Sequence, residues 1–75
     1  MKELIEVIAT ALVDRPDQVQ VHEKVEKDRK VYQLSVAKEE MGKVIGKGGR
    51  VAKAMRTVVS AAAAKEGTRV TLEIL

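Results

Sequence analysis

Cysteine is absent from this 75-residue chain, and Tyr32 is the only aromatic residue. Without cysteine the chain has no disulfides, thiolate zinc sites or thiol nucleophile, which suits a reducing compartment. A single ring also argues against a sheet that stacks several bases on exposed aromatic side chains. The one histidine, His22, has no second histidine or cysteine with which to build a site. We therefore expect no metal, no cofactor and no catalytic centre.

Long apolar runs are also missing. No stretch of the sequence is apolar enough for a membrane span, and Lys2, Glu3 and Glu6 occupy the start of the chain, where a signal peptide would need an apolar stretch. The length suits one small domain over residues 1–75. We expect a soluble, cytoplasmic, single-domain protein with no membrane partner.

Positive charge is concentrated in the second half of the chain. The formal net charge is only +3, yet basic residues outnumber acidic ones eight to three over residues 38–69. Five basic residues follow one another there with no acidic residue between them, and they are Lys43, Lys47, Arg50, Lys53 and Arg56. Such a run indicates either a surface that binds a polyanion or a solvated helix face.

Hydrophobic periodicity predicts a helix followed by a hairpin. Residues 1–13 carry apolar side chains at helical spacing, and Pro16 ends that helix because it cannot donate a backbone hydrogen bond. Residues 19–25 and 30–36 then alternate with a period of two around a charged tip at residues 26–29. The expected inward positions are Val19, Val21, Glu23 and Val25 in the first strand, and Tyr32, Leu34 and Val36 in the second.

The second half predicts two helices and a final strand. Residues 38–45 return to helical spacing, Gly46 ends that short helix, and a longer helix begins at Arg50 and stops at Gly67. Residues 69–75 alternate again as a strand. The residues expected to be buried on the longer helix are Val51, Met55, Val58, Val59 and Ala62. Three helices must therefore cover one face of a three-stranded sheet in an α+β fold.

The glycine-rich stretch "MGKVIGKGGR", residues 41–50, fits neither of two familiar nucleotide-binding motifs. A P-loop needs four residues between its glycines and a hydroxyl residue after its lysine, whereas Gly42 and Gly46 enclose three and Gly48 follows Lys47. A dinucleotide-binding motif must follow a strand and end in glycine, whereas here a helix precedes and Val51 takes the last position. Both interpretations are excluded.

The same stretch suits a tight turn between two helices that binds phosphate. Gly46 can leave the first helix with a positive φ, and Gly49 stands at the start of the second helix, where amide groups lack partners. An anion is favoured there by these amides and by the helix dipole. Lys47, Arg50 and Lys53 would add positive charge. The structural alternative is that the glycines only permit a sharp corner.

The sequence "VAKEEMGKVIGKGGR", residues 36–50, resembles the signature of the KH domain, in which a Gly-x-x-Gly loop joins two helices and holds the backbone of about four nucleotides. The opening "KELIEVIATALVD" and the closing "MRTVVSAAAAKEGTRVTLEIL" are similar to small stand-alone bacterial KH proteins of the KhpA family, so the resemblance covers residues 2–75. It implies a type II KH-like fold of order α-β-β-α-α-β, with a mixed three-stranded sheet. Gly48 stands where the family often has a larger polar residue.

The resemblance implies that the ligand is single-stranded RNA and that the role is non-catalytic, as an RNA chaperone or a post-transcriptional regulator. It places the bases in a shallow apolar groove floored by Val44 and Ile45, two positions that ordinary core packing also explains. The implied RNA-binding residues are Lys43, Val44, Ile45, Gly46, Lys47, Gly48, Gly49, Arg50 and Lys53.

One such module binds weakly, so we expect it to work in a multivalent assembly. Pairing with a second copy of the chain is one route, and the resemblance implies another, pairing with a KhpB- or Jag-like RNA-binding protein. The alanine stretch at residues 61–64 offers small side chains for a close helix contact, although helix propensity alone also explains it. The alternative function is a protein-interaction or ribosome-assembly adaptor whose loop no longer binds RNA.

Overall fold

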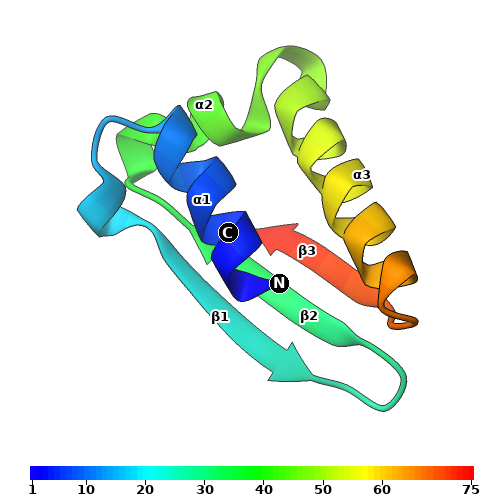
Figure 1. Cartoon of the computed structure of the whole chain (residues 1–75). Helices are drawn as coiled ribbons and strands as arrows, with labels where there is room; N and C mark the ends of the chain where they lie inside the picture. Colours follow the sequence, from blue (N-terminus) through cyan, green and yellow to red (C-terminus); the bar gives the residue numbers. More distant parts are fainter.

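Three helices lie on one face of a three-stranded sheet in the computed structural model, which covers residues 1–75 (Figure 1). This arrangement confirms the α+β class and the element order expected from the sequence. The elements are α1 (Lys2–Leu12), η1 (Pro16–Gln18), β1 (Gln20–Val25), β2 (Lys30–Ser35), η2 (Lys38–Glu40), α2 (Met41–Ile45), η3 (Lys47–Gly49), α3 (Arg50–Lys65) and β3 (Val70–Ile74), where η denotes a short 3₁₀ turn.

The sheet is mixed, with β2 in the centre. β1 pairs antiparallel with β2 as a hairpin, and β3 pairs parallel with β2 on the other side. A parallel pair requires a long crossover, and α2 and α3 supply it on the helical face. In the register, Tyr32 of β2 stands between Glu23 of β1 and Leu72 of β3.

The core forms between the helices and the inward-facing side of the sheet. Its central cluster comprises Ile5, Ala9, Val21, Tyr32, Leu34, Met55, Val59 and Leu72. Tyr32 is therefore a core residue, as expected, and its hydroxyl donates a hydrogen bond to Glu23 Oε1 at 3.2 Å. A buried tyrosine usually keeps a polar partner for its hydroxyl, and here the neighbouring strand provides one.

Three residues that were expected to face the core are exposed. The side chain of Val25 is 71% exposed, and Glu23 is also exposed, because β1 is an edge strand whose second half extends beyond α1 toward the hairpin tip (Figure 1). On α3 the buried residues are Ala52, Met55, Val59 and Ala63. This stripe is displaced from the predicted one, so that Val58 is 47% exposed.

Candidate nucleic-acid interface

The connection between α2 and α3 has a backbone that only glycine adopts readily. The φ angles of Gly46, Gly48 and Gly49 are +77°, +65° and +78°. A Cβ atom on Gly46 would lie 2.4 Å from Val51 Cγ2, so this glycine is also required by close packing. The Gly46 amide donates to the carbonyl of Gly42 at 2.8 Å, which closes α2. The sharp corner expected from the sequence is therefore present.

The first residues of this corner are exposed, and they lie where backbone amides begin a helical turn. In η3 the first backbone bond runs from the Gly49 N–H to the Gly46 carbonyl at 3.1 Å, so the Lys47 and Gly48 amides come before it. Lys47 and Gly48 are exposed. The 16-residue α3 begins one residue after Gly49, and the positive end of its dipole points at the same place. The corner therefore combines unpaired donors with a favourable potential for an anion.

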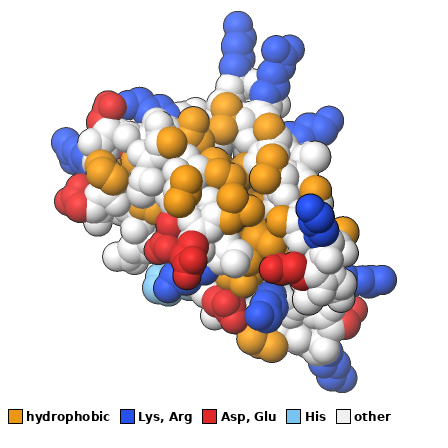
Figure 2. Space-filling model, viewed as in Figure 1, with side chains coloured by type: hydrophobic (Ala, Val, Ile, Leu, Met, Phe, Trp, Pro, Cys, Tyr) orange, Lys and Arg blue, Asp and Glu red, His pale blue; other side chains and the backbone are white.

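Three basic side chains surround this corner and are free of acidic partners. Lys47, Arg50 and Lys53 are all exposed, and none of them forms an ion pair within the chain. Figure 2 shows Lys and Arg side chains projecting from the end of the molecule that carries the α2–α3 connection. Their charge is therefore available to an external ligand.

Lys43 differs from these three because it is already paired. Its ammonium donates a hydrogen bond to the Asp14 carboxylate in the linker after α1. This hydrogen bond holds the pKa of the Asp14 carboxyl below its usual range and raises the pKa of the Lys43 ammonium. Both groups are exposed, so salt screens the pair. Asp14 offsets part of the positive charge that Lys43 would bring to a ligand.

The two apolar residues at the end of α2 have different environments. The Val44 side chain is 0% exposed and belongs to the core, whereas the Ile45 side chain is 38% exposed next to the glycine corner. Val44 thus has no surface to offer a ligand, and Ile45 is the one apolar side chain of this pair that a base can contact.

Sequence reasoning missed the roles of two residues near the site. Glu40, just before α2, is 6% exposed and accepts hydrogen bonds from the backbone amides of Asp14 and Arg15. Arg56, in the basic run, donates from Nε to the Leu72 carbonyl at 3.2 Å and so ties α3 to β3. A glutamate just before a short helix gives no sequence signal that would reveal a contact 26 residues away.

Groups suited to other chemistry are not found. No three His, Asp or Glu side chains come together as a metal-binding group. His22 is exposed on β1. None of the helices has the length and apolar character needed to span a bilayer.

A mixed three-stranded sheet covered by three helices, with an exposed Gly-x-x-Gly corner between the last two, is the arrangement of a KH domain. The family model described as "KhpA/KhpB, KH domain" matches residues 2–74. Curated relatives described as "RNA-binding protein KhpA" are 55% identical in Clostridium perfringens and 57% identical in Clostridium acetobutylicum, over 100% of both chains. The Treponema pallidum relative, with the same description, is 51% identical over 99% of this chain and 92% of its own. No solved structure shows a significant match.

The chain therefore belongs to the KhpA/KhpB family of KH-domain proteins. This family is non-enzymatic, which confirms the expectation that the chain is not an enzyme.

Proposed function

We propose that this protein binds single-stranded RNA by clamping its sugar-phosphate backbone at the corner formed by Gly46, Lys47, Gly48 and Gly49. The observation that carries the proposal is that the unpaired Lys47 and Gly48 amides and the three unpaired cations meet at one exposed helix start. Glycine lets the RNA backbone approach the chain closely. The relatives named as RNA-binding proteins support this assignment.

The two sides of the corner have different roles in this proposal. Arg50 and Lys53 continue the positive charge along the first turn of α3, while Ile45 gives one base an apolar contact. Lys43 contributes less because Asp14 is its partner. With few apolar contacts and no exposed ring, binding is weak and depends little on base identity, which suits an RNA chaperone or post-transcriptional regulator acting in the cytoplasm.

Binding of this kind must depend strongly on salt. If about three phosphates are neutralised on a single strand, affinity falls about 20-fold between 50 and 200 mM salt. Such a module needs a second RNA-binding surface to hold RNA at physiological salt.

The test replaces the corner with carboxylates. Lys47→Asp with Gly48→Asp places two negative charges where phosphate would lie, and Asp is among the residues that tolerate a positive φ. The matched control is Lys47→Asn with Gly48→Asn, which has similar shape and no added negative charge. We expect the acidic variant to lose RNA binding and the neutral variant to retain part of it, with native circular dichroism for both. Unchanged RNA affinity in a folded acidic variant contradicts the clamp.

We further propose that the second surface comes from pairing with another copy of the chain through the outer face of α3. Figure 2 shows apolar side chains gathered over the helical face, and the most exposed large one on α3 is Val58. Ala54 and Ala61 are exposed close to it on the same helix and allow close approach. Val58→Asp should convert a dimer into a monomer in light scattering, and a wild-type monomer at all concentrations contradicts self-pairing.

The family description names both KhpA and KhpB, so a KhpB- or Jag-like protein is the alternative occupant of this face. The adaptor function, with a loop that does not bind RNA, predicts partner binding that survives both nuclease treatment and the acidic loop variant. RNA-dependent partner binding contradicts the adaptor function.

A further inference from the structure

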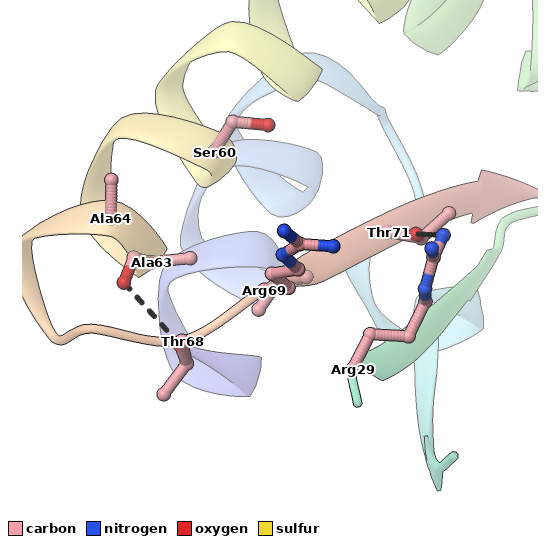
Figure 3. A pocket seen from close by; sticks show the side chains of 8 residues that line it. Arg29, Ser60, Ala63, Ala64, Thr68, Arg69 and Thr71 are labelled. Carbon is pink, nitrogen blue, oxygen red and sulfur yellow. Dashed lines mark hydrogen bonds between the residues drawn. The ribbon is translucent and has the colours of Figure 1, made fainter. Parts of the chain in front are cut away.

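A pocket lies at the end of α3 that is farther from the glycine corner. It belongs neither to that corner nor to the hydrophobic core. It has a volume of about 330 Å³ and lies between the last turns of α3 and the edge strand β3 (Figure 3). Two arginines and three hydroxyl residues line it, and they are Arg29, Arg69, Ser60, Thr68 and Thr71. Guanidinium groups beside hydroxyl groups are typical of sites for phosphate oxygens.

Backbone hydrogen bonds hold the two arginines next to each other. Arg29 ends the hairpin tip and Arg69 precedes β3, and the Lys30 amide donates to the Arg69 carbonyl at 2.9 Å. The turn before Arg69 is fixed because the Thr68 amide and hydroxyl both donate to the Ala63 carbonyl, at 2.9 and 3.3 Å. The pocket is therefore built on ordered backbone from three segments.

The arginine side chains already contact a carboxylate. Asp28 lies 3.6 Å from Arg29 Nε and 3.8 Å from Arg69 Nη1, and Arg29 Nη1 also donates to Thr71 Oγ1 at 3.3 Å. Both ion pairs are long and exposed, so water and salt weaken them. A single carboxylate leaves most of the ten N–H donors of two guanidinium groups unused. Besides Asp28, Glu26 in the hairpin tip and Glu66 in the turn after α3 bring negative charge to this end of the molecule.

A positive and polar stripe connects the glycine corner to this pocket. Lys53, Arg56 and Ser60 follow each other at spacings of three and four residues, so they lie on one face of α3. No acidic residue occurs anywhere in α3. The rise along the helix from Gly49 to Ser60 is about 16 Å. A strand held at the corner thus meets no acidic side chain of α3 on its way toward the pocket.

We propose that the pocket of Arg29 and Arg69 binds a second phosphate of the same RNA strand, beyond the roughly four nucleotides held at the glycine corner. This inference rests on the proposed RNA binding. It assigns to the chain a footprint longer than the corner alone, and it makes the hairpin tip and the turn before β3 part of the RNA-binding surface.

The test compares a short and a long RNA, an oligouridine of four nucleotides and one of twelve. Arg29→Gln with Arg69→Gln removes the pocket's charge at exposed positions. Lys2→Gln with Lys24→Gln is the matched control, because it lowers the net charge equally at exposed residues away from the pocket. In fluorescence anisotropy we expect the pocket variant to bind the twelve-nucleotide RNA about tenfold more weakly at 150 mM salt, with a salt slope smaller by about 0.7, because one phosphate contact is lost. Its affinity for the four-nucleotide RNA should match that of the control.

A third variant tests the pocket in the opposite direction. Asp28→Asn removes the carboxylate that competes for the guanidinium groups, so affinity for the twelve-nucleotide RNA should rise roughly fourfold. An unchanged long-RNA affinity in the pocket variant, or an equal loss for both RNA lengths, overturns the inference. Failure of the proposed function has a different signature, because then the acidic loop variant still binds the four-nucleotide RNA.

Discussion

Glu40 Oε2 accepts a hydrogen bond from the backbone amide of Asp14 at 2.9 Å, and this contact joins the linker after α1 to the start of α2. The Arg15 amide approaches the same oxygen at 3.5 Å. Because α2 leads directly into the glycine corner, the buried carboxylate helps to fix the position of the corner relative to α1. The exposed pair of Lys43 and Asp14 reinforces the same junction.

Glu40→Ala leaves the two linker amides without their partner, so we expect the free energy of unfolding to fall by about 1–3 kcal/mol. Glu40→Gln keeps a carbonyl acceptor and should lose less. The control is Glu39→Ala, since Glu39 is exposed and only 3.8 Å from the exposed Arg15 guanidinium, a pair worth about 0–1 kcal/mol. Urea denaturation measures all three. Equal losses for Glu39→Ala and Glu40→Ala contradict the role of the buried carboxylate.

Gly42 in α2 and Gly46, the residue that follows α2, should respond in opposite ways to alanine. Gly46→Ala places a Cβ 2.4 Å from Val51 Cγ2 at a φ of +77°, so it must shift the corner and lower both stability and RNA affinity. Gly42 lies within α2, and a Cβ added there would have no atom within 4 Å. Because alanine favours the helical conformation more than glycine does, Gly42→Ala should stabilise the protein by about 0.5–1 kcal/mol. Thermal melts and RNA titrations separate the two variants, and a neutral Gly46→Ala contradicts the close packing.

Tyr32 should make the protein sensitive to alkaline pH. Burial, together with the hydrogen bond to Glu23, raises the pKa of the Tyr32 phenol above its ordinary value of 10.0. The folded state therefore holds this proton more tightly than the unfolded state does. The resulting stability is complete below about pH 10 and is lost as the pH rises through the folded-state pKa.

Because Tyr32 is the only tyrosine and tryptophan is absent, phenolate absorbance reports this residue alone. We expect the pKa of the Tyr32 phenol, read from this absorbance, to be higher in the native protein than in the protein unfolded in urea. Tyr32→Phe should be less stable near neutral pH by about 0.5–1.5 kcal/mol, from the lost hydrogen bond, and should lose less stability above pH 10. Identical titrations in the native protein and in urea contradict this account.

Val44 and Ile45 provide a test that separates core from groove. Val44→Ala removes fully buried methyl groups and should lower the free energy of unfolding by about 1.5–2 kcal/mol. The variant molecules that remain folded should bind RNA with unchanged affinity. Ile45→Ala should cost less stability and weaken RNA binding. Denaturation curves and RNA titrations of both variants test this. Weaker RNA binding by Val44→Ala together with unchanged RNA binding by Ile45→Ala contradicts the assignment of Ile45 to the groove.

Element order and the glycine corner could be predicted from the sequence because each depends on local signals. Periods of two and 3.6 locate the strands and helices, and the glycines at positions 46, 48 and 49 mark the corner without any long-range information. Pro16 likewise marks the end of α1 to within a few residues.

Details that depend on tertiary contacts were not predictable in the same way. Val58 was predicted to be buried, but α3 is rotated slightly from the predicted orientation. Periodicity cannot distinguish the two orientations when alanines and valines occupy neighbouring positions. Val25 continues the alternation of β1 although no helix covers the end of that strand. The contacts of Glu40 and Arg56, and the meeting of Arg29 with Arg69, join segments far apart in sequence.

Amide NMR spectra recorded during titration with a four-nucleotide RNA test most directly whether phosphate binds at the corner. The account predicts that the largest chemical-shift changes occur at the amides of Lys47, Gly48 and Gly49, with smaller changes along the first turn of α3. The same titration of the Lys47→Asp, Gly48→Asp variant should leave the spectrum unchanged. Shifts concentrated on the open face of the sheet, with the amides of residues 47–49 unmoved, would contradict the account.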